Sequence, residues 1–170
     1  GLVCQAFGRW NHAIALSWVA HENLCLDNIY RNGSQYIREK YIPGLCSGEL
    51  IGALGLTEPG AGSDVLGSMR TSAVKDGDHY ILNGSKTYIT NGSIADIILV
   101  YTKTDFKKAN KGITAFVVET NNPGFKIISK LKKMGFRGSQ TNELFFEDFR
   151  VPAINMIGKE GEGHITVMNG

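Results

Sequence analysis

Apolar residues in the first fifty positions recur at steps of three and four, which is the spacing of one face of an α-helix. The positions that carry this pattern are Ile14, Leu16, Val19, Leu24, Leu26 and Ile29. Gly33 predicts the end of this helix, because a glycine after the last turn readily adopts the left-handed conformation. Ser34 is placed to cap a second helix over residues 35–41, which Pro43 and the following glycine are expected to close.

Beyond residue 68 the pattern changes to short apolar or alternating runs separated by turn residues, which is typical of β-strands. We expect strands over residues 71–74, 80–82, 86–90, 95–102, 113–119, 125–131 and 143–151. The run 95–102 is almost continuously apolar and β-branched, as in a strand buried on both faces. The expected turns lie at Gly77, Asn83-Gly84, Asn91-Gly92 and Gly124. Short strands at this spacing predict a Greek-key sandwich or barrel.

The order of the elements predicts an α+β protein of several domains. Helices come first, an antiparallel β-sandwich or barrel follows, and a second helical bundle begins at the end of the sequence. We expect the first helical domain to end within residues 1–51, the β domain to span residues 52–155, and the last domain to begin within residues 156–170. The sequence starts with Gly1 rather than methionine, and we expect it to be an excerpt of a longer protein.

Composition and charge narrow the function only slightly. The chain is 42% hydrophobic with a net charge of +2, and its basic residues are dispersed apart from one group near residue 132, so a nucleic-acid partner is not expected. No apolar run reaches the roughly 18 residues that a membrane-spanning helix needs. The three cysteines include no C-x-x-C pair, so neither a disulfide framework nor a metal site is expected.

The densest candidate chemistry lies in residues 54–64, Leu-Gly-Leu-Thr-Glu-Pro-Gly-Ala-Gly-Ser-Asp. Gly60 and Gly62 let the backbone approach a ligand closely, and Thr57 and Ser63 supply hydroxyl groups. Such a loop fits a ligand with carbonyl and amide edges, or a phosphate. It lacks the third glycine of a dinucleotide fingerprint and the Gly-Lys-Ser/Thr of a P-loop. These residues alone leave a binding loop and an ordinary glycine-rich surface turn equally open.

The same segment resembles the signature of the acyl-CoA dehydrogenase family at every fixed position. The resemblance continues, in the family's order, through Asn83-Gly84-Ser85-Lys86, Tyr88-Ile89-Thr90-Asn91-Gly92, Gly112-Ile113-Thr114-Ala115-Phe116, Met134-Gly135-Phe136-Arg137-Gly138-Ser139 and Phe146-Glu147-Asp148. It covers essentially the whole sequence, and residues 1–12 most weakly. The isovaleryl-CoA dehydrogenase branch is the most similar one, on His21-x-Asn23-Leu24-Cys25, Ser47-Gly48-Glu49-x-Ile51 and Asp78-His79-Tyr80-Ile81-Leu82.

The resemblance implies an FAD enzyme that converts a short branched-chain acyl-CoA of the isovaleryl type into the trans-2-enoyl-CoA. In the family a carboxylate removes the α-proton, FAD accepts the hydride from the β-carbon, and an electron-transfer flavoprotein receives the electrons. The resemblance also implies a homodimer or homotetramer that works in leucine or fatty-acid catabolism. Its location would be the mitochondrial matrix of a eukaryote or the cytoplasm of a bacterium.

The cofactor contacts are also implied by the resemblance. They are Leu54, Gly55, Leu56, Thr57, Glu58, Pro59, Gly60, Ala61, Gly62, Ser63, Tyr88, Ile89 and Thr90. Thr57 would hydrogen-bond the isoalloxazine edge, and Thr90 would reach the flavin N5 region. Tyr88 stands where the family usually has Trp, so we expect FAD binding in a somewhat altered flavin environment. An ordinary strand aromatic is the alternative interpretation of Tyr88.

The implied substrate contacts are Ser63, at the CoA portion, and the pair Asn110-Lys111. Lys111 stands where the isovaleryl branch has Arg, so it keeps the positive charge but loses the guanidinium fork. Ile165 departs from that branch, which has a substrate-contacting Tyr there. The carboxylates Glu58, Asp64, Glu160 and Glu162 match no base position of the family. We therefore expect the catalytic base to lie beyond Gly170, and the 170 residues alone to be inactive.

Two other functions remain open. An acyl-CoA oxidase, or another flavin enzyme of the same fold, would share this scaffold and differ in how O₂ reaches the reduced flavin. A non-catalytic module that binds flavin or acyl-CoA would keep the loop without the base. Oxygen consumption distinguishes the oxidase, and the residues that follow Gly170 distinguish the binding module.

Overall fold

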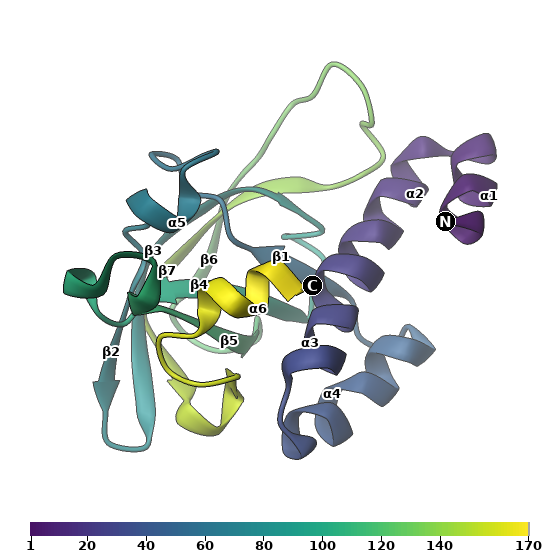
Figure 1. The fold of residues 1–170 in the computed structure, drawn as a ribbon. Coiled ribbons are helices and arrows are strands. Elements are labelled where there is room, and N and C mark those ends of the chain that lie inside the picture. The colour runs from purple at the N-terminus through teal and green to yellow at the C-terminus, as the bar shows by residue number, and fades with distance from the viewer. Residues whose placement is uncertain (170) are drawn as a thin grey trace.

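In the computed structural model, which describes residues 1–169, the helices of the first 47 residues lie to one side of an eight-stranded sheet (Figure 1). Gly170, which the sequence analysis placed in the last domain, lies outside the described residues. The helices are α1 (Leu2–Trp10), α2 (His12–Val19), the π-helix η1 (Ala20–Leu26), α3 (Asp27–Asn32), α4 (Gln35–Ser47), α5 (Val65–Ser68), the 3-10 helices η2 (Phe106–Gly112) and η3 (Ala153–Asn155), and α6 (Gly163–Asn169). Within the described residues, no helix has the length and apolar character needed to cross a membrane.

The predicted first helix is confirmed as a continuous rod made of α2, η1 and α3. Asn11 caps its beginning, because its side chain accepts hydrogen bonds from the N–H groups of Ala13 and Ile14 at 2.9 and 3.2 Å. The rod ends at Gly33, but the left-handed conformation predicted there is wrong, since φ is −72°. Glycine is required for another reason: a Cβ at this position would lie 2.5 Å from the Ile29 carbonyl oxygen.

The second helix, α4, begins as predicted and ends later than predicted. Ser34 caps it by accepting a hydrogen bond from Ile37 N–H at 3.3 Å. The prediction that Pro43 closes the helix is wrong, because α4 continues to Ser47 and Gly48 ends it with φ +80°. A proline removes one backbone hydrogen bond. The packing of the helix face against the sheet on both sides of Pro43 offsets this loss, through buried Ile37, Tyr41 and Leu45.

The strands form one connected sheet with the order β6-β7-β3-β2-β4-β5-β8, and β1 pairs separately with β4. Their bounds are β1 (Gly52–Gly55), β2 (Ser72–Asp76), β3 (His79–Thr90), β4 (Ile97–Lys103), β5 (Ile113–Glu119), β6 (Phe125–Lys130), β7 (Thr141–Pro152) and β8 (Met156–Ile157). Most pairings are antiparallel, whereas β1 and β2 pair with β4 in parallel. Strand β1 was not expected from the sequence, because it is short and contains two glycines.

The sheet folds back on itself and encloses a core. The ring of Tyr80 on β3 lies 4.9 Å from that of Phe116 on β5, although two strands separate β3 from β5 in the sheet order. This contact requires the two halves of the sheet to face each other. The predicted succession of helices and a β-sandwich is therefore confirmed, with a mixed sheet in place of a purely antiparallel one.

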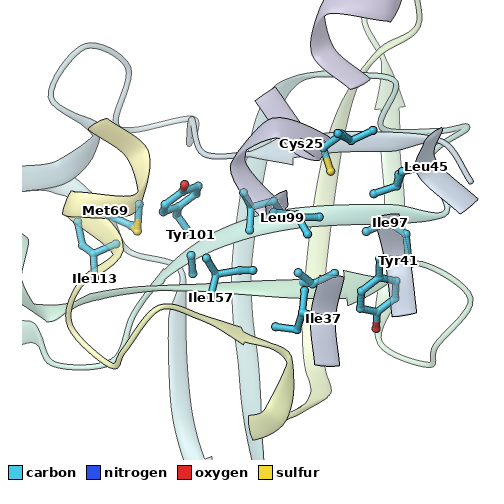
Figure 2. Close-up of a cluster of buried hydrophobic side chains, with 14 residues drawn as sticks. Cys25, Ile37, Tyr41, Leu45, Met69, Ile97, Leu99, Tyr101, Ile113 and Ile157 are labelled. Carbon is cyan, nitrogen blue, oxygen red and sulfur yellow. The ribbon is translucent and has the colours of Figure 1, made fainter. Parts of the chain in front are cut away.

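Strand β4 is buried on both faces, as predicted. Ile98 and Val100 point into the core between the two halves of the sheet. Leu99 and its neighbours in the alternate positions pack against the helices, where Cys25 and Leu45 meet them (Figure 2). Strand β4 thus joins the helical layer to the sandwich.

The turn predicted at Asn83-Gly84 is wrong, because β3 continues through it as one strand. The pairing of β3 with β7 shifts register between Leu82 and Gly84, which marks a β-bulge. Gly84 has φ +147°, and a Cβ there would lie 2.6 Å from Thr71 Cα. This glycine therefore permits a close approach of two backbones. The turns predicted at Gly77 and Asn91 are confirmed, with φ +61° and +66°.

Candidate functional site

The glycine-rich loop (residues 54–63) leaves the sheet at the end of β1 and turns back on itself. Glu58 and Ala61 exchange two backbone hydrogen bonds, of 3.3 and 3.0 Å, so Pro59 and Gly60 form an exposed turn. Thr87 N–H donates to the Thr57 carbonyl oxygen at 2.9 Å, which joins the loop to β3. The loop therefore lies beside the second predicted cofactor segment, the aromatic segment (residues 88–90).

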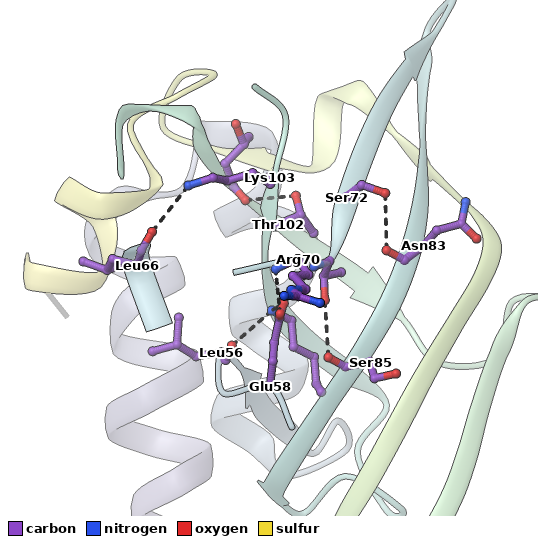
Figure 3. A network of polar contacts seen from close by, with 12 residues as sticks. Leu56, Glu58, Leu66, Arg70, Ser72, Asn83, Ser85, Thr102 and Lys103 are labelled. Carbon is purple, nitrogen blue, oxygen red and sulfur yellow. Dashed lines mark hydrogen bonds and ion pairs between the residues drawn. The ribbon is translucent and has the colours of Figure 1, made fainter. Parts of the chain in front are cut away.

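Glu58 holds the loop in place from inside the protein. Its carboxylate accepts hydrogen bonds from the N–H groups of Arg70 and Thr71, at 2.6 and 2.9 Å (Figure 3). The ammonium group of Lys86, which is completely buried, lies 2.9 Å from Glu58 Oε1 and also donates to the Leu56 carbonyl oxygen at 3.0 Å. The Glu58 side chain, expected to contact the cofactor, is thus engaged in internal contacts.

Both members of this buried pair have altered pKa values. Burial lowers the pKa of Lys86 to about 8, against the opposing effect of the Glu58 charge. Burial would raise the pKa of Glu58, but the Lys86 ammonium and the surrounding N–H groups lower it below its usual value. A carboxylate with so many donors is a poor proton acceptor. Glu58 is therefore unsuited to act as a catalytic base.

Tyr88 is presented to solvent by a distortion of β3. The pairing with β7 shifts register between Lys86 and Ile89, and Tyr88 has φ +58°, an uncommon value for an aromatic residue. Its side chain is 69% exposed, whereas Ile89 is buried in the core between the sheets. Of these two residues, only Tyr88 can offer its side chain to a ligand. Such a strained, exposed aromatic residue is a candidate binding surface.

Ala109, which precedes the predicted substrate pair Asn110-Lys111, lines a cleft together with Gly60 of the glycine-rich loop. The cleft has a volume of about 620 Å³ and is lined by Gly60, Gly67, Ser68, Met69, Arg70, Lys103, Phe106 and Ala109. Lys103 joins its two sides, because its ammonium group donates to the Leu66 carbonyl oxygen (Figure 3) and also to the Ala109 carbonyl oxygen. Asn110 and Lys111 follow Ala109 on η2 and are exposed, as is Ser63 on the loop.

The structural role of Lys86 was not expected from the sequence, although the alternation along β3 carries a signal of it. Tyr80 and Leu82 mark the inward-facing positions of β3, and Lys86 falls on the same phase of the alternation. A charged residue at an inward position requires a buried partner. That partner is Glu58, in the glycine-rich loop.

Fold and site define a protein with a helical layer, a β-sandwich, and a candidate ligand site formed by a glycine-rich loop, an exposed aromatic ring and a cleft lined by Arg70. The sequence profile of the acyl-CoA dehydrogenase N-terminal domain matches residues 1–49, and that of the acyl-CoA dehydrogenase middle domain matches residues 53–149. The chain belongs to the acyl-CoA dehydrogenase family.

Curated relatives agree with this assignment. The chain is 52% identical to mitochondrial isovaleryl-CoA dehydrogenase of Pongo abelii, over 99% of this chain and 40% of the relative. It is 50% identical to the short-chain specific acyl-CoA dehydrogenase of Clostridium acetobutylicum, over 88% of this chain and 39% of the relative. The chain thus spans about two fifths of the length of these relatives.

Solved structures with the same fold include butyryl-CoA dehydrogenase from Megasphaera elsdenii, with a TM-score of 0.96 and 43% identity over 99% of this chain and 44% of that one. A chain in the structure described as the electron transferring flavoprotein of Acidaminococcus fermentans has a TM-score of 0.96 and 41% identity, over 98% and 44% of the two chains. The structure of PigA with FAD and proline has a TM-score of 0.93 and 35% identity, over 99% and 44%.

Replacing Lys86 by Met should lower the free energy of unfolding by about 3–5 kcal/mol, because it leaves the Glu58 carboxylate buried without its counterion. The double variant Glu58→Gln/Lys86→Met should lose less, since no uncompensated charge remains. Urea unfolding at neutral pH measures both. Lys126→Met is the matched control: the Lys126–Glu147 pair is about half exposed, and its loss should cost less than about 1 kcal/mol. Equal losses for Lys86→Met and Lys126→Met would contradict the assigned role.

The stabilisation that Glu58 provides should disappear in acid. The pKa of Glu58 is lower in the folded protein than in the unfolded chain, where it is about 4.3. Its contribution is therefore fully present above that pH and is lost as the pH falls through the folded-state value. Below about pH 4 the wild-type protein should lose stability more steeply than the double variant. Urea midpoints at successively lower pH test this, and parallel curves for the two proteins would refute it.

Proposed function

We propose that this chain supplies the FAD- and CoA-contacting part of an acyl-CoA dehydrogenase that converts a short branched-chain acyl-CoA, of the isovaleryl type, into the trans-2-enoyl-CoA. The observation that carries the proposal is the juxtaposition of two segments. The glycine-rich loop and the aromatic segment are joined by the 2.9 Å hydrogen bond between Thr87 and Thr57, and Tyr88 stands exposed beside them. The names of the relatives support the choice of substrate.

The side chains at this junction fit a planar heterocycle with polar edges, such as the isoalloxazine of FAD. Tyr88 offers an exposed aromatic face, and Thr57 and Thr90 are partly exposed hydroxyl residues on the two adjoining segments. Space is open around Gly60 and Gly62, where a Cβ would meet no atom within 4 Å. When bound, FAD supplies the acceptor for the hydride. The contribution of these residues is to bind and orient it.

The cleft between α5 and η2 fits the CoA portion of the substrate. The buried Lys103 ammonium in its wall is engaged by the carbonyl oxygens of Leu66 and Ala109. Two exposed cationic side chains remain: Arg70, which lines the cleft, and Lys111, which follows on η2. Cationic groups of this kind complement the phosphates of CoA. We propose Ser63, three residues after the cleft-lining Gly60, and Asn110, which follows the cleft-lining Ala109, as substrate contacts together with Lys111.

The catalytic base is proposed to lie outside the described residues. Glu58 is held by Lys86 and two backbone N–H groups, and Asp64 accepts a 2.6 Å hydrogen bond from Ser68. We further propose that the whole protein passes electrons to an electron-transfer flavoprotein and assembles as a homodimer or homotetramer. Its proposed location is the mitochondrial matrix in a eukaryote and the cytoplasm in a bacterium.

The proposed activity can be tested with the protein made from its complete reading frame. Isovaleryl-CoA should bleach its flavin absorbance and yield a product that has lost two hydrogen atoms, whereas the 170-residue chain should reduce no dye with any acyl-CoA. Reoxidation by electron-transfer flavoprotein, rather than by O₂, is expected. Failure of the complete protein to oxidise any short acyl-CoA would refute the proposal, and rapid oxygen consumption would identify an oxidase instead.

Tyr88→Ala should weaken FAD binding about tenfold, because the ring loses its contact with the flavin. The same change should alter the free energy of unfolding by no more than about 0.5 kcal/mol, since the side chain is exposed. Tyr88→Trp, which enlarges the aromatic face, is the matched variant and should bind FAD at least as well as the wild type. Flavin fluorescence titration and urea unfolding measure the two quantities. Unchanged FAD affinity in Tyr88→Ala would show that Tyr88 is an ordinary strand residue.

A further inference from the structure

Both polar backbone groups of Gly52, the first residue of β1, are bound by side chains. Its N–H donates to His21 Nδ1 at 2.9 Å, and its carbonyl oxygen accepts from Asn91 Nδ2 at 3.3 Å. The preceding residue, Ile51, uses its carbonyl oxygen to pair with β4. The backbone N–H and C=O groups of neighbouring residues in a strand point to opposite edges of that strand. Those of Gly52 therefore point away from β4. The two side chains thus satisfy the edge of β1 that lies away from its partner strand.

His21 links three elements through one ring. It lies in the π-helix η1, accepts from Gly52 on β1, and its Nε2 lies 3.0 Å from the Leu45 carbonyl oxygen on α4. A ring nitrogen that accepts from an N–H carries no proton, so the proton of the neutral ring is on Nε2 and is donated to Leu45. Each nitrogen of His21 therefore has a different partner and a different role.

Asn91 connects the aromatic segment to β1 and to the helical rod. It follows Thr90 directly, is 1% exposed and has φ +66°. Its Nδ2 donates to the carbonyl oxygens of Gly52 and of Ser17 on α2, the latter at 2.9 Å. Its Oδ1 is buried without a partner among the described residues, a cost that the two donated bonds must offset.

The residues that flank the aromatic segment, Thr87 and Asn91, consequently connect it to the glycine-rich loop and to the strand before that loop. One connection is the bond between Thr87 N–H and the Thr57 carbonyl oxygen, close to the exposed Tyr88. The other is the bond between Asn91 and Gly52, behind the site. Side-chain packing cannot replace the second connection at Gly52, because a Cβ there would lie 2.8 Å from the Cys25 sulfur.

We propose that His21 and Asn91 are positioning residues, which fix Gly52 and thereby set the glycine-rich loop against the aromatic segment before any ligand binds. The identity of the ligand of these two segments rests on the proposed function. The hydrogen bonds of His21 and Asn91 to Gly52 do not depend on it. A site whose parts are held in advance loses less conformational freedom on binding. The two residues therefore contribute to affinity for the cofactor without touching it.

Two substitutions at His21 separate its two hydrogen bonds. In His21→Asn, the carboxamide oxygen can take the place of Nδ1 and accept from Gly52. In His21→Gln, the longer carboxamide can take the place of Nε2 and donate to Leu45, while Gly52 N–H loses its acceptor. Both variants remove the aromatic ring, so each is the control for the other. Asn91→Gly keeps a residue that tolerates positive φ and removes the whole side chain, and with it both donated hydrogen bonds.

Hydrogen exchange by NMR on the whole 170-residue chain, without ligand, gives the readout. In His21→Gln the amides of Gly52 and Thr87 should exchange about tenfold faster than in the wild type, and in His21→Asn they should stay within about threefold of it. Asn91→Gly should accelerate Thr87 in the same way as His21→Gln. The amide of Val117, in the core of β5, reports global unfolding. The increase in exchange rate at Gly52 and Thr87 must exceed any increase at Val117.

Equal acceleration in His21→Asn and His21→Gln would overturn the proposal, because it would assign the effect to lost packing. Faster amide exchange at Gly52 with an unchanged rate at Thr87 would also overturn the proposal. FAD titration of the same samples keeps the two proposals apart. A wild-type chain that binds no FAD would count against the proposed role of its cofactor contacts in isolation, while the exchange rates would still decide whether His21 and Asn91 position the loop.

Discussion

The ion pair between Lys86 and Glu58 determines where the glycine-rich loop lies. Both groups have left water, so an arrangement that separates them carries a large desolvation cost without the compensating attraction. The Glu58 carboxylate also accepts from the N–H groups of Arg70 and Thr71, just before β2, and the Lys86 ammonium donates to the Leu56 carbonyl oxygen of the loop. A segment rich in glycine would otherwise have many conformations. The pair holds it at Leu56 and Glu58, beside the part of β3 from which Tyr88 emerges.

Fixing the loop from behind leaves its outer surface free. Pro59, Gly60 and Ser63 are exposed, and the neighbouring ring of Tyr88 is held outward by a backbone conformation that most residues avoid. The internal contacts therefore fix the position of the loop, and the exposed groups remain available to a ligand. Lys103 plays the same part at the cleft, where it ties the carbonyl oxygens of α5 and η2 together.

Hydrophobic periodicity predicted the helical rod and the doubly buried β4, because both depend on patterns that extend over many residues. Local turn chemistry was less reliable. Pro43 and Gly84 were expected to end elements, and in both places the element continues. At Pro43 the buried helix face outweighs one lost hydrogen bond, and at Gly84 the glycine serves a close approach to Thr71. Contacts from distant parts of the chain decided both cases.

In the candidate site, too, some features follow from the sequence and others depend on contacts between distant residues. Its exposed residues follow from the glycine pattern and the family resemblance, but the residues that hold them do not. Lys86 and Glu58 are 28 residues apart, and His21 is 31 residues from Gly52. No periodicity links such positions, so their partners become visible only in the folded chain. The consequence is physical: the helical rod must dock on the sheet before His21 can hold β1, and the site therefore acquires its geometry together with the fold, not after it.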